Sequence, residues 1–350
     1  YNNMIYIRTD ANHEIATGHV MRCLTIAEEL KRENRDVCFV VSDEASLPLI
    51  RQRAYPALVM QDDWKSPDID REFSELCKRA GKQDILLVDS YYITNEYLKR
   101  MKSIFKIVVF DDLFSEKKDA DILINYNAFY RKFDYAERYR DSNCKLLLGE
   151  KYVPLREQFR ETEKQERVRD RAGMEVLLMC GGGDRYNMIL GVLQDLYQHE
   201  ESTFSRCNWN VVIGSYYPSK DELTAFADMH ENISVMENIS NMAEVMSRSD
   251  LCVTAASTVL YECCAMLVPT IFFVVADDQI YDAECFSQDQ MMLYCGNFAT
   301  KKEESLIQFE KQFPLTILNQ VRRQDMKEKM RRFSDADGAK RIVAAILDRE

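Results

Sequence analysis

The stretch that decides the fold spans residues 4–41, with MIYIR at 4–8, GHVMRCLTIAEELKR at 18–32 and VCFVV at 37–41. The first and last runs are rich in β-branched and aromatic side chains. The last run is continuously apolar, as expected of a strand buried inside a parallel sheet. In the middle run the apolar residues recur at helical spacing. A strand, a helix and a strand in this order predict a βαβ unit.

The same alternation continues on both sides of a charged stretch, RETEKQERVRDR, at residues 160–171. Before this stretch, further strands are expected at 57–60, 85–88, 107–110, 122–124 and 145–148. After it, strands are expected at 176–180, 209–213, 233–236, 251–254 and 270–275. We therefore predict an α/β chain of two Rossmann-like, doubly wound domains, residues 1–160 and 172–350. The second is expected to end in a closing helix from about residue 321.

Composition narrows the classes of function. The 350 residues include 46 basic and 58 acidic side chains, a net charge of −12, which argues against a general nucleic-acid binder. A small anionic ligand remains compatible, because helix N-termini bind phosphate without net positive charge. No apolar run reaches the roughly 18 residues of a membrane span, so stable membrane insertion is not expected. The 11 cysteines form no C-x-x-C pair and predict reduced, mostly buried thiols of a cytoplasmic protein.

Ligands of doubly wound sheets bind outside the carboxyl ends of the strands, so we expect an interdomain cleft lined by the residues that follow strands. The first such cluster is Arg8 and Asp10 together with Gly18-His19 at a strand-to-helix junction. A histidine near a helix N-terminus should stay neutral and able to accept a proton. The alternative is a surface histidine that caps the helix. Of the other histidines, His13 lies in the same loop, and those at 199 and 230 are expected to be solvated.

Three more polar clusters follow strands of the first half, and they are Asp89-Ser90-Tyr91, Asp111-Asp112 and Asn125-Tyr126-Asn127. Each cluster alone is as consistent with turns and caps as with function. Because all three lie at the same edge of the predicted sheet, together they favour a polar pocket. The adjacent carboxylates at 111 and 112 should point to opposite sides, and no histidine or cysteine ligand set accompanies them. No metal site and no cofactor are therefore expected.

The second half carries three clusters of its own. The turn Gly181-Gly182-Gly183-Asp184 opens this half and could let a phosphate approach backbone N–H groups. Ser257 and Thr258 are placed to cap a helix, and Glu262, about one turn later, could chelate a ribose diol. Asp278-Gln279 follows the run at 270–275 and could contact a sugar. Capped helices and surface carboxylates are the structural alternatives.

In this order the clusters resemble the UDP-sugar hydrolases of pseudaminic acid biosynthesis and the related spore-coat polysaccharide proteins. That family shares the two-domain GT-B fold of the peptidoglycan N-acetylglucosaminyltransferase. The resemblance implies hydrolysis of a UDP-linked amino or deoxy sugar, such as UDP-2,4-diacetamido-2,4,6-trideoxy-β-L-altropyranose, to UDP and free sugar, with a histidine as general base. The site residues it implies are His19 and Tyr91 for catalysis; Arg8, Asp10, Gly18, Arg22, Asp89, Asn127, Asp278 and Gln279 for the sugar; and Gly182, Gly183, Asp184, Ile239, Ser257, Thr258 and Glu262 for the nucleotide.

Three positions depart from the family pattern. Ala16 stands where the family has glycine, Ser90 where it often has histidine, and Asp278 where it has asparagine. The last change replaces a hydrogen-bond donor with a charge. Two other readings stay open at this point: a UDP-sugar-dependent glycosyltransferase using the same residues, and a non-catalytic nucleotide-sugar-binding protein.

Overall fold

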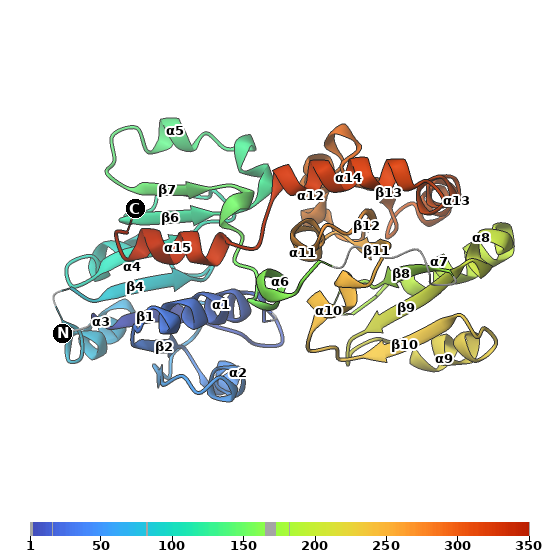
Figure 1. The fold of residues 1–350 in the computed structure, drawn as a ribbon. Coiled ribbons are helices and arrows are strands. Elements are labelled where there is room, and N and C mark those ends of the chain that lie inside the picture. The colour runs from blue at the N-terminus through green and yellow to red at the C-terminus, as the bar shows by residue number, and fades with distance from the viewer. Residues whose placement is uncertain (1–2, 16, 82, 165–172, 182, 350) are drawn as a thin grey trace. The chain divides into compact units, whose positions relative to one another are not determined.

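The computed structural model describes residues 3–15, 17–81, 83–164, 173–181 and 183–349. The chain forms two compact units. The first unit comprises Tyr1–Leu155 and Asp337–Glu350, and the second comprises Arg156–Ala336. Each is built around a parallel sheet with helices (Figure 1). None of the described helices combines the length and the apolar character needed to cross a membrane.

The first unit holds a seven-stranded sheet in the order β3-β2-β1-β4-β5-β6-β7. Its strands are β1 (Ile5–Thr9), β2 (Val37–Val41), β3 (Ala57–Val59), β4 (Ile85–Asp89), β5 (Lys106–Phe110), β6 (Ile122–Asn125) and β7 (Lys145–Leu148). Its helices are α1 (Gly18–Arg32), α2 (Leu47–Gln52), α3 (Ile69–Cys77), α4 (Asn95–Met101), α5 (Tyr135–Arg138) and α15 (Gly338–Ile346). Strand order reverses direction between β1 and β4, which is where doubly wound sheets bind ligands.

Side chains along each strand point alternately to the two faces of the sheet, and this explains why helices cover both faces in this unit. Ile5 and Ile7 of β1 face a core that includes α1 and α15, whereas Tyr6 between them faces the core under α3 and α4. Because successive strand residues point to opposite faces, a strand apolar on both faces must be covered on both. The predicted doubly wound arrangement is confirmed for this unit.

The second unit holds a six-stranded sheet in the order β10-β9-β8-β11-β12-β13. Its strands are β8 (Met174–Leu178), β9 (Cys207–Ile213), β10 (Ile233–Glu237), β11 (Leu251–Ala255), β12 (Thr270–Val274) and β13 (Leu293–Asn297). Its helices are α6 (Gln158–Glu161), α7 (Met188–His199), α8 (Glu201–Ser205), α9 (Lys220–Asp228), α10 (Met242–Ser247), α11 (Val259–Met266), α12 (Ile280–Phe286), α13 (Lys302–Ile317) and α14 (Gln320–Phe333). Here the order reverses between β8 and β11.

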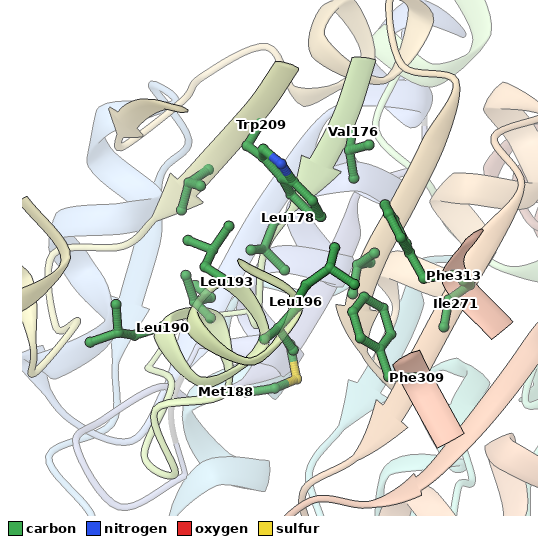
Figure 2. Packing of buried hydrophobic residues seen from close by; sticks show 14 of the residues in the cluster. Val176, Leu178, Met188, Leu190, Leu193, Leu196, Trp209, Ile271, Phe309 and Phe313 are labelled. Atoms are coloured by element: carbon green, nitrogen blue, oxygen red, sulfur yellow. The ribbon is translucent and has the colours of Figure 1, made fainter. Parts of the chain in front are cut away.

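The core of the second unit centres on Trp209, which is fully buried. Its ring stacks on Phe313 of α13, with centroids 5.3 Å apart, and on Phe204 of α8 at 5.6 Å. The indole N–H donates to the Phe204 carbonyl oxygen at 3.2 Å, so the buried polar atom has a partner. Figure 2 shows side chains from α7, the strands and α13 gathered in this one cluster. The packing fixes α7 and α13 against the same sheet face.

Two features differ from the sequence-based expectation. Strand β13 was not expected, because Leu-Tyr-Cys-Gly-Asn contains a glycine and alternates too briefly to indicate a strand. The residues from about 321 onward form two helices rather than one closing helix of the second domain. Of these, α15 belongs to the first unit, where Ile342 and Val343 join its core. The assignment of the last residues to the second domain is therefore corrected.

The free thiols are mostly buried, as expected.

Candidate functional site

His19 and Asp89 form the centre of the candidate site in the first unit. His19 is the second residue of α1, and Asp89 ends β4, the strand paired with β1. Asp89 Oδ1 lies 2.7 Å from His19 Nδ1. Since an ionised carboxylate only accepts hydrogen bonds, Nδ1 carries the ring proton. The hydrogen bonds of the His19 ring to described residues run through Nδ1, so Nε2 keeps a free lone pair.

Arg22 lies one helical turn after His19 and ties two carboxylates together. It donates to Asp89 through Nε at 2.6 Å and Nη2 at 2.5 Å, and to Asp112 through Nη2 at 2.8 Å. Its guanidinium also lies 4.3 Å from the centre of the Phe110 ring. Burial alone raises the pKa of the Asp89 carboxyl, but the Arg22 guanidinium and the His19 ring outweigh it, so the net pKa is well below its usual range. Asp89 is therefore ionised across the physiological range.

Tyr91 and Asn127 complete this constellation. The Tyr91 ring meets the His19 ring edge to face, with centroids 4.6 Å apart. Its hydroxyl donates to Asp112 Oδ2 at 3.0 Å, and Asn127 Nδ2 donates to Asp112 Oδ1 at 3.0 Å. Burial of the hydroxyl end and then the Asp112 carboxylate raise the pKa of Tyr91. Tyr91 therefore remains protonated and supports the His19 ring, and it cannot itself serve as a base.

The adjacent carboxylates after β5 point to different partners, as expected. Asp111 is buried, accepts a hydrogen bond from the Tyr135 hydroxyl at 2.9 Å and caps the turn at Phe114. Asp112 instead faces Arg22 and Tyr91. Gly18 is exposed, and a Cβ there would meet open space. Ala16 lies outside the described residues.

Arg8 and Asp10 do not line the site, which corrects the expectation that they bind the sugar. Arg8 is 0% exposed and pairs with Glu72 of α3 through Nε at 3.0 Å and Nη2 at 2.9 Å. Its Nη1 donates to Asp10 at 2.7 Å, and Asp10 also accepts from the Ser42 backbone N–H at 2.7 Å. Tyr97 donates to Glu72 at 2.6 Å. These groups form a buried network that fixes the β1 end beneath the site.

The other histidines differ from His19 in their surroundings. His13 is exposed and makes no hydrogen bond with any residue the structure describes. His199 is also exposed, as expected. His230 was expected to be solvated, but it is half-buried, with its ring 4.6 Å from Phe226 and 4.5 Å from Tyr197. Among the described residues, His19 is the histidine that contacts a fully buried aspartate, Asp89, at 2.7 Å.

In the second unit, Asp184 caps α7. It is buried, and its two oxygens accept the backbone N–H groups of Met188 at 2.7 Å and Ile189 at 2.8 Å. The carboxylate therefore occupies the anion-binding end of that helix, and a phosphate would be repelled there. The expectation that Asp184 contacts the nucleotide is corrected accordingly. Gly183 is exposed with open space above its Cα, and Gly182 lies outside the described residues.

The start of α11 is open. Ser257 Oγ accepts the Val259 N–H at 3.2 Å, and Thr258 is exposed. Within the described ranges, no acceptor meets the backbone N–H groups of Ser257 and Thr258. One turn later, the carboxylate of the half-buried Glu262 accepts no hydrogen bond from any described residue. Burial raises its pKa to about 7, and the Arg156 guanidinium limits the rise. A diol or other paired donor would satisfy this carboxylate.

The loop after β10 carries Ile239, which is half-buried. Gln158 of α6 holds the part of this loop that follows Ile239 through two hydrogen bonds. Its Nε2 donates to the Ser240 carbonyl at 3.1 Å, and its Oε1 accepts the Ala243 N–H at 3.2 Å. Sequence reasoning did not single out Gln158, because a lone glutamine carries no positional signal until its partners are known. These two hydrogen bonds fix the backbone directly after Ile239.

The loop after β12 contains Asp278, which is exposed, and Gln279, whose Oε1 accepts the Val275 N–H at 2.9 Å. Beside this loop is a cavity of about 450 Å³. It is lined by the residues following β8, β12 and β13, among them Gly183, Arg185 and Asp277. Sequence reasoning did not identify Arg185, although it directly follows the glycine-rich turn. A cationic side chain thus stands beside an open glycine at the carboxyl end of this sheet.

Known proteins resemble this chain in sequence and in fold. The model of the Glycosyltransferase family 28 C-terminal domain matches residues 175–342. An uncharacterized protein of Methanocaldococcus jannaschii is 28% identical over 278 residues, 76% of this chain and 54% of that protein, so the chain spans about half its length. The UDP-2,4-diacetamido-2,4,6-trideoxy-beta-L-altropyranose hydrolase of Campylobacter jejuni is 27% identical over 264 residues, 74% of this chain and 86% of that protein.

Solved structures extend the likeness to nearly the whole chain. MurG of Acinetobacter baumannii matches with a TM-score of 0.67 and 13% identity, covering 99% of this chain and 100% of that chain. The calicheamicin glycosyltransferase CalG4 matches with a TM-score of 0.62 and 11% identity, covering 99% of each chain. At such identities the likeness shows the fold alone. The expected GT-B-like fold is thus confirmed, and so is the resemblance to the UDP-sugar hydrolase family and its glycosyltransferase relatives.

Proposed function

We propose that this protein is an enzyme that hydrolyses a UDP-linked amino or deoxy sugar, with His19 as the general base. The observation that carries the proposal is the contact of 2.7 Å between Asp89 and His19 Nδ1, which leaves Nε2 free to accept a proton. The 27% identical Campylobacter hydrolase supports the substrate class, a UDP-linked 2,4-diacetamido-2,4,6-trideoxy sugar.

The chemistry follows from the protonation states in the first unit. Nε2 of His19 takes a proton from water as the water oxygen bonds to the anomeric carbon. The bond from that carbon to the phosphate oxygen breaks, and its electron pair leaves with UDP. Asp89 stabilises the imidazolium that forms, and it remains ionised because Arg22 holds its charge. Tyr91 keeps the ring in place and Asn127 orients Asp112.

The second unit offers groups suited to UDP. Glu262 would accept the ribose hydroxyls, and the backbone beside Ile239, held by Gln158, would meet the uracil. The free N–H groups of Ser257 and Thr258 would meet the diphosphate, with a helix N-terminus behind them. A diphosphate is a stable leaving group, so the reaction needs no separate general acid.

A second candidate is transfer of the sugar to an acceptor hydroxyl. The match of residues 175–342 to the Glycosyltransferase family 28 C-terminal domain favours it, because that family is named for sugar transfer. The base role would be the same. The two functions differ in whether UDP release requires an added acceptor. Tight UDP binding without turnover would instead indicate a non-catalytic nucleotide-sugar-binding protein.

The test is to incubate the purified protein with UDP-2,4-diacetamido-2,4,6-trideoxy-β-L-altropyranose, without any acceptor, and to measure UDP and free sugar. The proposal expects both products in equal amounts. His19→Ala should lower the rate by about 10²–10⁴-fold, the usual contribution of a general base. His13→Ala, a change of the same type at an exposed histidine, serves as the matched control and should keep the rate. Full activity of His19→Ala would overturn the mechanism, and UDP release only with an acceptor would identify a transferase.

A further inference from the structure

A second cluster of chemically capable side chains lies where α7 packs beside α13, away from the groups assigned to UDP. Asp195 and His199 are four residues apart on α7 and therefore on one face of the helix. Glu310 comes from the middle of α13. His199 Nδ1 lies 3.3 Å from Asp195 Oδ1 and 3.1 Å from Glu310 Oε1. One ligand atom from each residue lies within 4.8 Å of the others.

These separations suit a shared metal ion better than an ion pair. A ring nitrogen carries one hydrogen, so Nδ1 cannot donate fully to both oxygens at once. Nitrogen and oxygen ligands bind zinc at about 2.0–2.2 Å, and the corners of such a tetrahedron lie about 3.4 Å apart. The two measured separations are close to that edge length. The third separation, between the Asp195 and Glu310 ligand oxygens, is within 4.8 Å, so a bound ion would draw these two carboxylates toward it.

A buried oxygen provides an independent indication. Asp195 Oδ2 is buried and accepts no hydrogen bond from any residue in the described part of the chain. A buried, unsatisfied carboxylate oxygen costs free energy unless a partner is supplied.

We propose that Asp195, His199 and Glu310 form a binding site for a divalent transition-metal ion, with Zn²⁺ as the fitting ion. Imidazole and carboxylate ligands suit zinc, and three protein ligands leave a fourth position for water. The His199 side chain is 47% exposed, so solvent ions can reach the site. His199 is also the last residue of α7, where the helix dipole favours a cation.

The site would join two helices that the core already holds in position. Leu193 and Leu196 of α7 and Phe309 and Phe313 of α13 belong to one buried cluster, and Figure 2 shows them together. Glu310 lies between Phe309 and Phe313 in sequence, so the packing of those rings fixes the helix backbone from which its side chain extends. Preorganised ligands lose little freedom on binding an ion. The metal would therefore stabilise the second unit rather than take part in the proposed hydrolysis.

The test is a titration of the chelator-treated full chain with Zn²⁺ in a calorimeter, in a Cys77→Ser background because Cys77 is the exposed thiol. One ion per chain is expected. Loss of even an outer-shell partner lowers metal affinity by about 10–100-fold, so His199→Ala and Glu310→Gln should each weaken binding at least that much. His13→Ala is the matched control and should bind as the background does. Thermal melting checks that each variant is folded and should show a zinc-dependent rise in Tm only where the site is intact.

Cobalt provides a second readout with the same variants. Co²⁺ bound by nitrogen and oxygen ligands should give visible absorption bands without the charge-transfer band of a thiolate ligand, and His199→Ala should abolish them. The proposal is overturned if zinc binds equally well to His199→Ala and to the background. It is equally overturned if the folded background binds no zinc, or if the cobalt spectrum reports a thiolate ligand.

Discussion

The Asp89 carboxylate contacts His19 Nδ1 at 2.7 Å and Arg22 Nη2 at 2.5 Å, so one buried oxygen serves both a histidine and an arginine. Arg22 keeps Asp89 ionised, and the ionised carboxylate keeps the proton of His19 on Nδ1. The position and the protonation state of the His19 ring are thereby set by the same contact with Asp89. This arrangement is the basis of the first prediction.

Asp89→Asn should lower kcat for UDP release by about 10²–10⁴-fold with a small change in KM, because an amide no longer fixes the His19 tautomer or stabilises its charged form. Steady-state kinetics of UDP release measure this. Circular dichroism and thermal melting show whether the variant is folded. A folded Asp89→Asn enzyme with unchanged kcat would mean that His19 is not the base.

Arg8→Met tests whether the buried network under β1 is structural. Removing one partner of a buried ion pair leaves Glu72 uncompensated, so the free energy of unfolding should fall by about 3–5 kcal/mol. Denaturant unfolding measures the change. Arg53→Met is the matched control: the side chains of its ion pair with Glu28 are 40% and 30% exposed, and its loss should cost less than about 1 kcal/mol. If Arg8→Met had normal stability but bound the substrate weakly, the structural role would be contradicted and Arg8 would be assigned to the sugar site.

Asp184→Ala separates a helix cap from a nucleotide contact. The variant should lose about 0.5–2 kcal/mol of stability, the usual value for a cap. UDP affinity, measured by calorimetry, should not weaken, because a carboxylate does not attract the diphosphate. Asn319→Ala removes the side-chain cap of α14 and provides a comparison at another helix. A large loss of UDP affinity confined to Asp184→Ala would contradict the structural role.

Glu262 predicts a pH dependence of nucleotide-sugar binding. Its pKa is raised to about 7 by burial, so the carboxyl is protonated below that pH and ionised above it. Only the ionised form accepts both ribose hydroxyls fully, so affinity for a UDP-sugar should increase between pH 6 and pH 8. Glu262→Gln should bind more weakly and without this increase. The stability of the ligand-free protein should depend on pH in the opposite direction. The raised pKa means that this group's contribution to stability is present at low pH and is lost as the pH rises through about 7. An unchanged pH profile in Glu262→Gln would contradict the assignment.

The sequence predicted most of the fold because the buried strands are nearly all continuous apolar runs. It also placed His19, Tyr91 and Asp89 at one sheet edge. The roles of charged residues were harder to predict. Arg8 has the same position relative to β1 whether it faces a ligand or Glu72, and the partner lies 64 residues away. Asp184 likewise becomes a cap only because the turn brings its oxygens to the N–H groups of α7. The place of α15 depends on long-range packing that periodicity cannot show.

The most direct test of the central claim is to run the reaction in water enriched in ¹⁸O and to analyse the released UDP by mass spectrometry. If water activated by His19 attacks the anomeric carbon, the oxygen between that carbon and the phosphate stays with UDP, and UDP should carry no ¹⁸O. His19→Ala, run beside it, should release UDP about 10²–10⁴-fold more slowly. Incorporation of ¹⁸O into UDP would show attack at phosphorus and would contradict the account, as would undiminished turnover by His19→Ala.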